Sequence, residues 1–182
     1  MDNGASSYRR FLNGDEKAFD EIMEELFFGL VFFVDRYVHD VHAAEDIAMD
    51  AVSDLFVHRH RYNFKVSLKT YLYMLGKSRA LNYIKKRKRE KTFELSCANV
   101  LEDEENDLET TVLSDERSQK INEALADLPD EMRRAVHLVY LEGMTYGEAA
   151  KVMGLKAKQI DNLLCRAKKD LRAILGEGGD YL

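Results

Sequence analysis

The sequence predicts an all-α protein of two small helical domains joined by a flexible acidic linker, the second of them a helix-turn-helix domain. Apolar residues recur at spacings of three and four through both halves of the chain, which is the period of an amphipathic helix. Pro129 is the one proline among 182 residues, so the helices have few enforced breaks. A content of 46% hydrophobic and 33% charged residues suits a soluble helical protein with a buried core.

The first domain is expected over residues 7–91. A broad apolar face from Phe19 to Val34 predicts a long helix, and a second helix is expected from about Ala43 to His60. After a break in the pattern, a third helix begins near Leu68 and ends in the basic run Lys85–Arg89. The domain therefore ends in its most positively charged segment.

The second domain is expected over residues 117–175 and contains a helical hairpin. Ala149 and Ala150 are small where two helices must cross closely, and Gly154 can adopt the positive φ that ends one helix and turns into the next. A long basic helix follows from about Lys156 to Leu175. Its apolar residues recur at helical spacing and are expected to dock it on the preceding helix: Ile160, Leu163, Leu164, Ala167 and Leu171.

The remaining segments carry little apolar patterning. Residues 92–116 are expected to form the acidic linker, and the glycine-rich residues 176–182 a flexible tail. Cys97 and Cys165 are too few for a disulfide framework or a tetrahedral zinc site, which favours free thiols in a reducing cytosol. The longest apolar run, Leu26–Val34, has nine residues, about half of a membrane span. The sequence thus predicts a cytoplasmic protein with no membrane insertion.

Charge is strongly segregated along the chain, although the formal net charge of −6 would by itself argue against nucleic acid. Residues 1–55 hold thirteen acidic and four basic residues, whereas residues 77–91 hold eight basic residues and one acid. Residues 94–116 hold nine acids and no lysine or arginine, and in residues 156–172 six basic residues face two acids. The two basic blocks are where contact with phosphates is expected.

This order of parts resembles the extracytoplasmic-function (ECF, group IV) sigma factors of bacterial RNA polymerase, in the sigma-70 family. Four stretches, spanning about residues 8–175, carry the resemblance.

The first, residues 44–56, is similar to the family helix that binds the clamp helices of the polymerase β′ subunit. Met49 stands where the family usually has Gln, and Phe56 where it usually has Trp. The resemblance assigns core-polymerase binding to Asp46, Ile47, Asp50, Asp54 and Phe56. Without it, three aspartates spaced four apart would indicate only a solvated acidic face.

The second stretch comprises residues 64–84 and the basic run after them. It is similar to the region that, in relatives, melts the minus-ten promoter element and holds a flipped base of the non-template strand in the loop before the helix. Aromatic rings suit stacking on bases, and basic side chains suit phosphates. Ser78 replaces a usual Asn. The resemblance assigns minus-ten DNA binding to Asn63, Phe64, Lys65, Val66, Ser67, Tyr71, Lys77, Ser78, Arg79, Asn82, Lys85 and Lys86. The alternative is that at least half of Tyr71, Leu72, Leu75 and Tyr83 are simply core.

The third stretch is the acidic linker, which in relatives threads towards the polymerase active site and the RNA exit path. Its carboxylates could occupy a channel built for RNA because they carry the same sign of charge as RNA; the alternative is a solvated tether.

The fourth stretch, residues 124–175, resembles the domain that reads the minus-35 element. Asp161 stands where many relatives have a basic residue. The resemblance assigns minus-35 DNA binding to Thr145, Tyr146, Lys156, Lys158, Gln159, Asn162, Arg166, Lys168 and Lys169.

The sequence is therefore identified as a sigma factor of the ECF type, which binds core polymerase and directs promoter recognition, DNA melting and transcription initiation. The expected partners are core RNA polymerase, through its β′ clamp helices and β flap, promoter DNA, and a separate anti-sigma factor. A helix-turn-helix regulator that is not a polymerase subunit is the alternative. Such a regulator would share the fourth stretch, but would not explain the basic third helix or the acidic linker.

An enzyme is the alternative of a different class. His39, His42, His58 and His60, with nearby carboxylates, could be assembled into a metal phosphohydrolase site. However, His58 and His60 point to different faces of a helix, which is the wrong spacing for a helical ligand pair. The sequence also has no phosphate-cradling glycine loop and no nucleophile elbow. We therefore expect no enzymatic activity, no metal and no cofactor.

Overall fold

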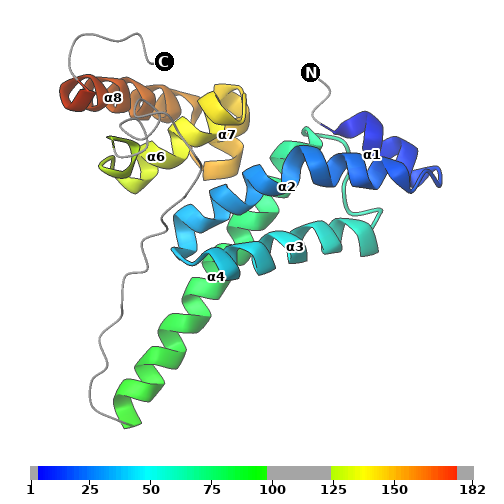
Figure 1. The fold of residues 1–182 in the computed structure, drawn as a ribbon, viewed down its shortest axis with the longest axis horizontal. Coiled ribbons are helices and arrows are strands. Elements are labelled where there is room, and N and C mark those ends of the chain that lie inside the picture. Colours follow the sequence, from blue (N-terminus) through cyan, green and yellow to red (C-terminus); the bar gives the residue numbers. More distant parts are fainter. Residues whose placement is uncertain (1–3, 98–123, 176–182) are drawn as a thin grey trace. The chain divides into compact units, whose positions relative to one another are not determined.

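The computed structural model describes residues 4–97 and 124–175 of the chain. Within these ranges the secondary structure is entirely helical, which confirms the all-α class. The chain divides into two compact units, residues 1–108 and 109–182 (Figure 1). The predicted linker lies mostly outside the described residues, and the predicted tail 176–182 lies wholly outside them.

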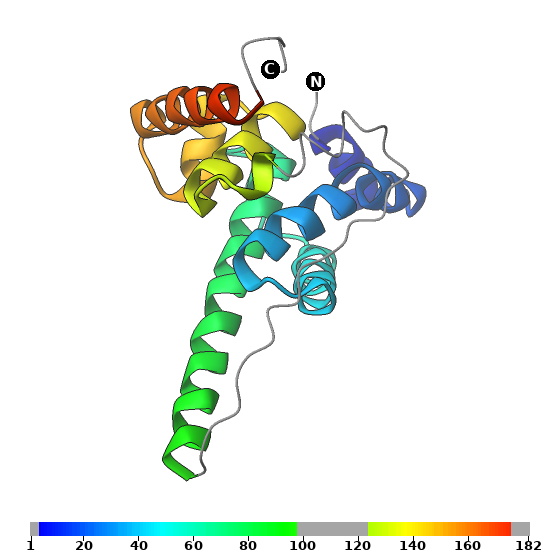
Figure 2. The same ribbon diagram turned by 60° about the vertical axis from the view of Figure 1, so that its left-hand side comes forward.

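The first unit contains four helices among its described residues: α1 (Ala5–Leu12), α2 (Lys17–Val38), α3 (Val41–Val57) and α4 (Leu68–Cys97). α2, α3 and α4 pack on one another, and α1 packs on α2 (Figures 1 and 2). Leu30 and Phe33 of α2, Leu55 of α3 and Leu72 of α4 are among the fully buried side chains of this core. The helix α1 was not distinguished from the sequence pattern, because eight residues are too few to show a period clearly.

Local chemistry sets the boundary between α2 and α3. His39 adopts the left-handed conformation, with φ of 51°, and ends α2. The Asp40 carboxylate then accepts a hydrogen bond of 3.1 Å from the backbone N–H of Ala43 and so caps α3. The two helices therefore form a tight antiparallel pair, with the small residues Ala44 and Ala48 of α3 fully buried.

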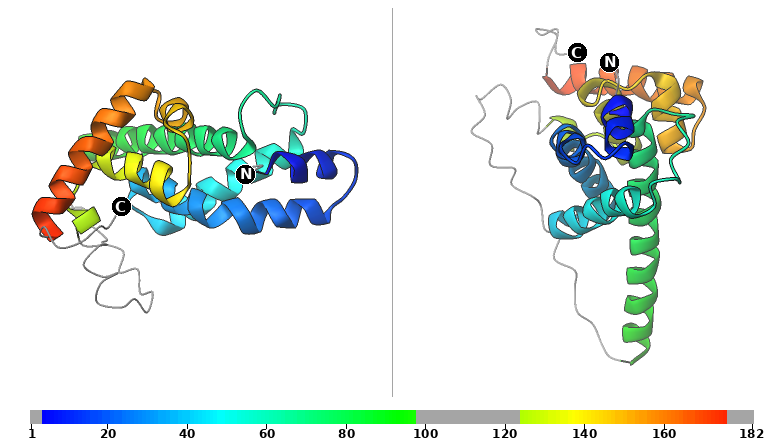
Figure 3. Two further views of the ribbon diagram at one scale, coloured as in Figure 1. Left: turned by 90° about the horizontal axis from the view of Figure 1, so that it is seen from above. Right: turned by 90° about the vertical axis from the view of Figure 1, so that its right-hand side faces the viewer.

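α4 continues to Cys97, beyond residue 91, where the first domain was expected to end. Its first half packs in the core, and its second half projects away from α2 and α3 (Figures 1 and 3). Residues 85–92 of this projecting half are exposed. The basic run is thus presented on a helix that other parts of the first unit do not cover.

In the second unit the described residues form α6 (Asp130–Val136), the π-helical segment η1 (His137–Leu141), α7 (Tyr146–Met153) and α8 (Ala157–Leu175). Thr145 and Glu148 form a reciprocal capping box at the start of α7. Gly154 has φ of 72° and ends α7, as its position predicts. Ala149, Ala150 and Ile160 are buried where α7 meets α8, which confirms the predicted hairpin.

Gly76 of α4 lies at a close approach to α2. A Cβ atom at this position would be 2.8 Å from Leu30 Cδ1 and 3.2 Å from Val34 Cγ2, and both residues are fully buried. Gly147 of α7 is also helical, but a Cβ atom there would meet nothing within 4 Å. The two helical glycines therefore differ in whether there is space for a side chain, so the same substitution can be compared at both.

We predict opposite effects of the same substitution at these glycines. Gly76→Ala should lower the free energy of unfolding of the first unit by about 1–3 kcal/mol, because the methyl group overpacks the α2–α4 contact. Gly147→Ala should be neutral or raise the stability of the second unit by about 0.5–1 kcal/mol, because alanine is the better helix former. Urea unfolding of both variants checks this. Equal stability of Gly76→Ala and the wild type would show that the contact is loose.

Candidate functional site

The three aspartates of α3 do not have equal access to a partner. The Asp50 side chain is 74% exposed and Asp46 is also exposed, but the Asp54 side chain is only 12% exposed. The Asp54 carboxylate lies 2.9 Å from His58 Nδ1, 3.1 Å from Arg61 Nη1 and 3.6 Å from Arg79 Nη2. Asp54 therefore ties α3 to its own C-terminal turn and to α4.

Two other predicted site residues, Arg79 and Ile47, also make contacts within the first unit. Arg79, expected to contact DNA phosphate, lies between Asp54 and Asp50, whose Oδ2 is 3.8 Å from its Nη1. Ile47, expected to contact polymerase, is only 7% exposed and belongs to the core. Of the three predicted aspartates, Asp46 and Asp50 are thus the ones exposed on α3.

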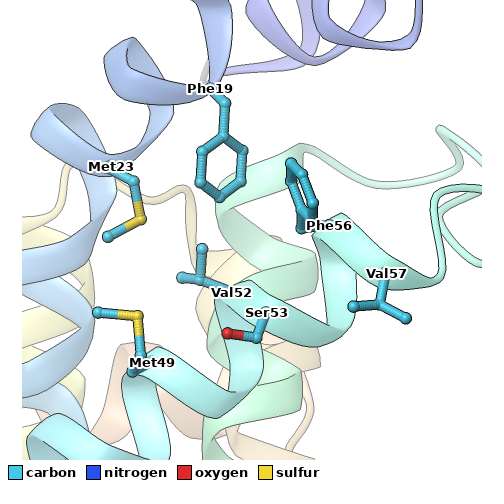
Figure 4. A pocket seen from close by; sticks show the side chains of 7 residues that line it. All are labelled: Phe19, Met23, Met49, Val52, Ser53, Phe56 and Val57. Carbon is cyan, nitrogen blue, oxygen red and sulfur yellow. The ribbon is translucent and has the colours of Figure 1, made fainter. Parts of the chain in front are cut away.

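An apolar groove lies between α2 and α3 (Figure 4). Its volume is about 270 Å³, and Met23 of α2 and Met49 of α3 face one another across it. Phe56, a predicted polymerase-binding residue, forms part of its wall and is 39% exposed. The complete lining is Phe19, Met23, Met49, Val52, Ser53, Phe56 and Val57. Since Met49 and Asp50 are consecutive on α3, an apolar surface and an acidic one adjoin.

The loop before α4 is built around a buried tyrosine. Tyr62 is 3% exposed, and its hydroxyl donates a 2.6 Å hydrogen bond to the carbonyl oxygen of Val66. The Asn63 side-chain oxygen accepts a hydrogen bond from the N–H of Lys65, and Ser67 Oγ accepts one from the N–H of Thr70 in the first turn of α4. Three of the predicted minus-ten residues, Asn63, Val66 and Ser67, therefore fix the shape of the loop.

Phe64 stands at the tip of this loop in a strained conformation. Its φ is +59°, a value that residues other than glycine seldom adopt. Its ring lies 4.6 Å from the Tyr62 ring, and Tyr62 in turn lies 5.2 Å from Tyr71, centroid to centroid. Phe64 is 37% exposed, and its neighbour Lys65 is also exposed. The loop thus presents one aromatic and one basic side chain to the outside.

The predicted residues on α4 divide between core and surface. Ser78, Asn82, Lys85 and Lys86 are exposed, and Lys77 is half-buried. Of the four residues for which a core role was the alternative, Leu72 is fully buried, while Tyr71, Leu75 and Tyr83 are half-buried. The exposed residues continue into the projecting basic half of the helix.

α1 contributes side chains that the sequence analysis did not assign to any site. Tyr8 is fully buried, and its hydroxyl donates to the carbonyl oxygens of Leu55 at 3.1 Å and Arg59 at 2.9 Å. Burial raises the pKa of Tyr8 to about 12, which is consistent with a hydroxyl that stays protonated and donates to these carbonyl oxygens. The pair of arginines flanked by aromatic residues at positions 8–11 is the sequence signal that could have identified this segment.

In the second unit, the outer face of α8 is exposed as expected, but its first turn is engaged in local contacts. The Gln159 amide oxygen accepts a 2.8 Å hydrogen bond from the N–H of Lys156, and Lys158 Nζ lies 2.7 Å from Asp161 Oδ2. Asn162 and Arg166 are exposed one turn further along. Gln159 therefore caps the helix with the atom that it would need for a bidentate contact to adenine.

The two lysines near the middle of α8 also differ from one another. Lys168 Nζ lies 5.2 Å from the centroid of the Tyr140 ring, and a hydrogen bond with that side chain raises the pKa of Lys168. Lys169 is exposed. Thr145 caps α7, and Tyr146 beside it is 40% exposed. Of the two lysines, Lys169 is thus the better placed for an external phosphate.

Residues 4–97 and 124–175 contain no group of three or more His, Cys, Asp or Glu side chains arranged to hold a metal ion. His58, which was considered as a ligand in the enzyme alternative, pairs with Asp54. In the same part of the chain, no helix combines the length and the apolar character that a membrane span requires.

Two protein-family models match the chain, one to each unit. The model of sigma-70 region 2 matches residues 30–90, and the model of sigma-70 region 4 matches residues 118–171. The ECF RNA polymerase sigma factor SigM of Bacillus subtilis is 26% identical over 163 residues, which are 87% of this chain and 96% of SigM. The RNA polymerase sigma-H factor of Pseudomonas aeruginosa is 25% identical over 168 residues, covering 88% of this chain and 87% of that protein.

Solved structures share the same fold. The sigma factor RpoE from Bartonella quintana, crystallised with the anti-sigma factor NepR, matches with a TM-score of 0.65 and 20% identity, covering 90% of this chain and 99% of that chain. CnrH, solved with the cytosolic domain of CnrY, matches with a TM-score of 0.59 and 17% identity, covering 97% of each chain. At these identities the structural matches support the fold.

We predict that Asp54 and Asp46 differ in their contribution to stability. Asp54→Asn should lower the free energy of unfolding of the first unit by about 1–2 kcal/mol, because the charge that holds His58, Arg61 and Arg79 is lost. Asp46→Asn, on the same face but exposed, should change it by less than about 0.5 kcal/mol. Urea unfolding measures both values. A similar, small effect for the two variants would contradict the structural role of Asp54.

Proposed function

This chain belongs to the ECF group of the sigma-70 family, and from that membership we propose which surfaces bind core polymerase and promoter DNA. Its function is that of an ECF RNA polymerase sigma factor in transcription initiation. We propose that α3 binds core polymerase, that the loop before α4 and α4 itself open the minus-ten element, and that α7 and α8 bind the minus-35 element. The observation that carries the proposal is the occurrence of both sigma-70 regions, in order, in one helical chain.

The surface proposed for core polymerase combines charge with apolar area. Asp46 and Asp50 are exposed and suit the basic side chains of a partner, here the β′ clamp helices. The groove beside them offers Met49 and Phe56 as apolar contacts (Figure 4). Methionine adapts its shape to a partner, and apolar area supplies affinity that exposed charges alone do not. Asp54 supports this surface from within.

Opening of the minus-ten element is proposed for the loop at residues 62–67 and the exposed side of α4. Phe64 gives a stacking surface for an unpaired base, and such stacking offsets the few kcal/mol that unstacking costs. Lys85 and Lys86, exposed on the projecting part of α4, suit the phosphates of the strand. We assign Arg79 a structural role rather than a DNA contact, because Asp50 and Asp54 hold its guanidinium.

Recognition of the minus-35 element is proposed for α8, with its N-terminal half in the major groove. Asn162 suits an adenine edge and Arg166 a guanine edge, and both are exposed. Gln159 positions this half of the helix through its cap, and Lys169 suits a phosphate. The β flap of core polymerase is the further partner proposed for this unit.

A separate anti-sigma factor is also a proposed partner. RpoE of Bartonella quintana, which shares the fold, was crystallised with the anti-sigma factor NepR. The acidic linker, most of which lies outside the described residues, is proposed to enter the polymerase channel that later holds RNA. We propose no enzymatic activity for the chain, in keeping with the family.

Charge reversal on α3 tests the polymerase-binding surface. With purified core, the wild-type chain should give run-off transcripts from promoters that core alone does not use. Asp46→Lys combined with Asp50→Lys should weaken binding to core about tenfold or more, because two favourable charge contacts become repulsive. The matched control is Asp20→Lys with Glu24→Lys, which reverses two exposed acids at the same spacing on α2. Fluorescence titration with labelled chain measures affinity, and circular dichroism checks the helical content.

Two outcomes would contradict this proposal in different ways. If both double variants bind core as the wild type does, α3 is not the binding surface. If the wild type forms no complex with core and gives no transcripts, the chain does not act as a sigma factor.

A promoter-library selection tests the reading face of α8. Asn162→Ala should change the minus-35 sequences that are selected, with about 1–3 kcal/mol less discrimination at one position. Lys169→Ala should weaken all sequences alike and reduce the salt dependence of binding by about one phosphate contact. Gln159→Ala should lower the stability of the α8 N-terminus and leave the selected sequence largely unchanged. An identical sequence preference for Asn162→Ala and the wild type would show that this face positions the protein and does not read bases.

A further inference from the structure

α1 reaches the loop before α4 through a cation–aromatic contact. The guanidinium carbon of Arg9 lies 5.0 Å from the centroid of the Phe64 ring, above the ring. The Tyr8 ring, beside Arg9 in the chain, lies 6.1 Å from Phe64 and 5.5 Å from Tyr62. α1 and the loop are therefore neighbours in the first unit, although Arg9 and Phe64 are 55 positions apart in the sequence.

The position of Arg9 is set by a rigid support. Tyr8 is fully buried and fixed by its hydroxyl to the carbonyl oxygens of Leu55 and Arg59, and the Phe11 ring packs 5.8 Å from the Tyr8 ring. Arg9, between these two anchored side chains, is exposed. The backbone of Arg9 is thus held in place, while its side chain stays accessible.

Arg9 and Arg10 differ in the use of their charge. Arg10 donates hydrogen bonds to Asp15 and Glu21, with an N–O distance of 2.9 Å to the latter. Within residues 4–97 the Arg9 guanidinium has no ion-pair partner and lies against the Phe64 ring. An arginine whose charge is not neutralised, beside an exposed aromatic ring, is a pattern found where single-stranded nucleic acid is bound.

We propose that Arg9 of α1 is a nucleotide-binding residue of the minus-ten site, acting with Phe64 on an unstacked nucleotide of single-stranded DNA. This inference rests on the proposed function and extends the site to a helix outside the loop and α4. Because the Arg9 guanidinium lies over the Phe64 ring, its outer face can extend the stack to an unpaired base, and its charge suits the phosphate of the same nucleotide. The φ of +59° at Phe64 supports the assignment, since strain of this kind tends to occur at ligand-binding positions.

The test uses holoenzyme assembled from core polymerase and the full chain. The DNA is a fork that is duplex at the minus-35 element and has a single-stranded non-template minus-ten segment. Arg9→Ala should weaken binding of this fork about tenfold, while binding of a duplex that ends upstream of the minus-ten element should not change. Arg10→Ala removes the same charge from the same helix and should bind both DNAs as the wild type does. Arg9→Lys keeps the charge without the plane and should restore only part of the affinity, because stacking is lost.

The outcomes separate this inference from the function on which it rests. If Arg9→Ala binds the fork with wild-type affinity, or if Arg9→Ala and Arg10→Ala weaken it equally, Arg9 is not a site residue and the inference is wrong. Full restoration by Arg9→Lys would show that charge alone acts and would overturn the stacking role. If wild-type holoenzyme binds neither DNA, the proposed function itself fails. Circular dichroism and core binding of Arg9→Ala, both expected to match the wild type, establish that the fold is intact.

Discussion

The buried hydroxyl of Tyr8 is the interaction on which the first unit's outer surfaces depend. It donates to backbone carbonyl oxygens of Leu55 and Arg59, at the end of α3, and burial raises its pKa to about 12. Its ring also contacts Phe11, Tyr62 and Phe64. One side chain thus joins α1, the end of α3 and the loop before α4. A buried polar group of this kind stabilises only the arrangement that satisfies it, so it specifies the geometry as well as contributing to stability.

Several charged side chains of the proposed surfaces form ion pairs within the chain. Asp54 holds His58, Arg61 and Arg79, and Lys158 pairs with Asp161. These pairs are of two kinds. Lys158 and Asp161 are three residues apart on one helix, and exposed pairs of this kind contribute little to stability. Asp54 joins two helices at a position that is 12% exposed, where a missing partner costs more. Fewer charged side chains are therefore available to partners than the composition indicates. The surfaces proposed for polymerase and DNA consist of correspondingly fewer residues.

Local patterns predicted most of the fold, and long-range contacts account for what they missed. The apolar period of α8, the small residues Ala149 and Ala150 and the left-handed Gly154 each act within a few residues of sequence, so the helix-turn-helix followed from them. The exposed face of α8 likewise followed from residue spacing, whereas Phe64 was assigned through the family resemblance. In contrast, nothing local to Asp54 indicates Arg79, which lies 25 residues away on another helix. The π-helical turn of η1 and the short α1 also have no clear period to reveal them.

The same contacts connect the two proposed activities of the first unit. Arg61, held by Asp54 of α3, directly precedes Tyr62, which shapes the loop that carries Phe64. The surface proposed for polymerase and the site proposed for an unpaired base are therefore built on one packed scaffold. Interactions that order the loop before DNA arrives reduce the conformational entropy lost on binding. The strain at Phe64 fits this reading, because a left-handed phenylalanine persists only where its surroundings hold it. In this arrangement, binding of polymerase along α3 need not reshape the base site: it needs only to bring an already formed site to the promoter.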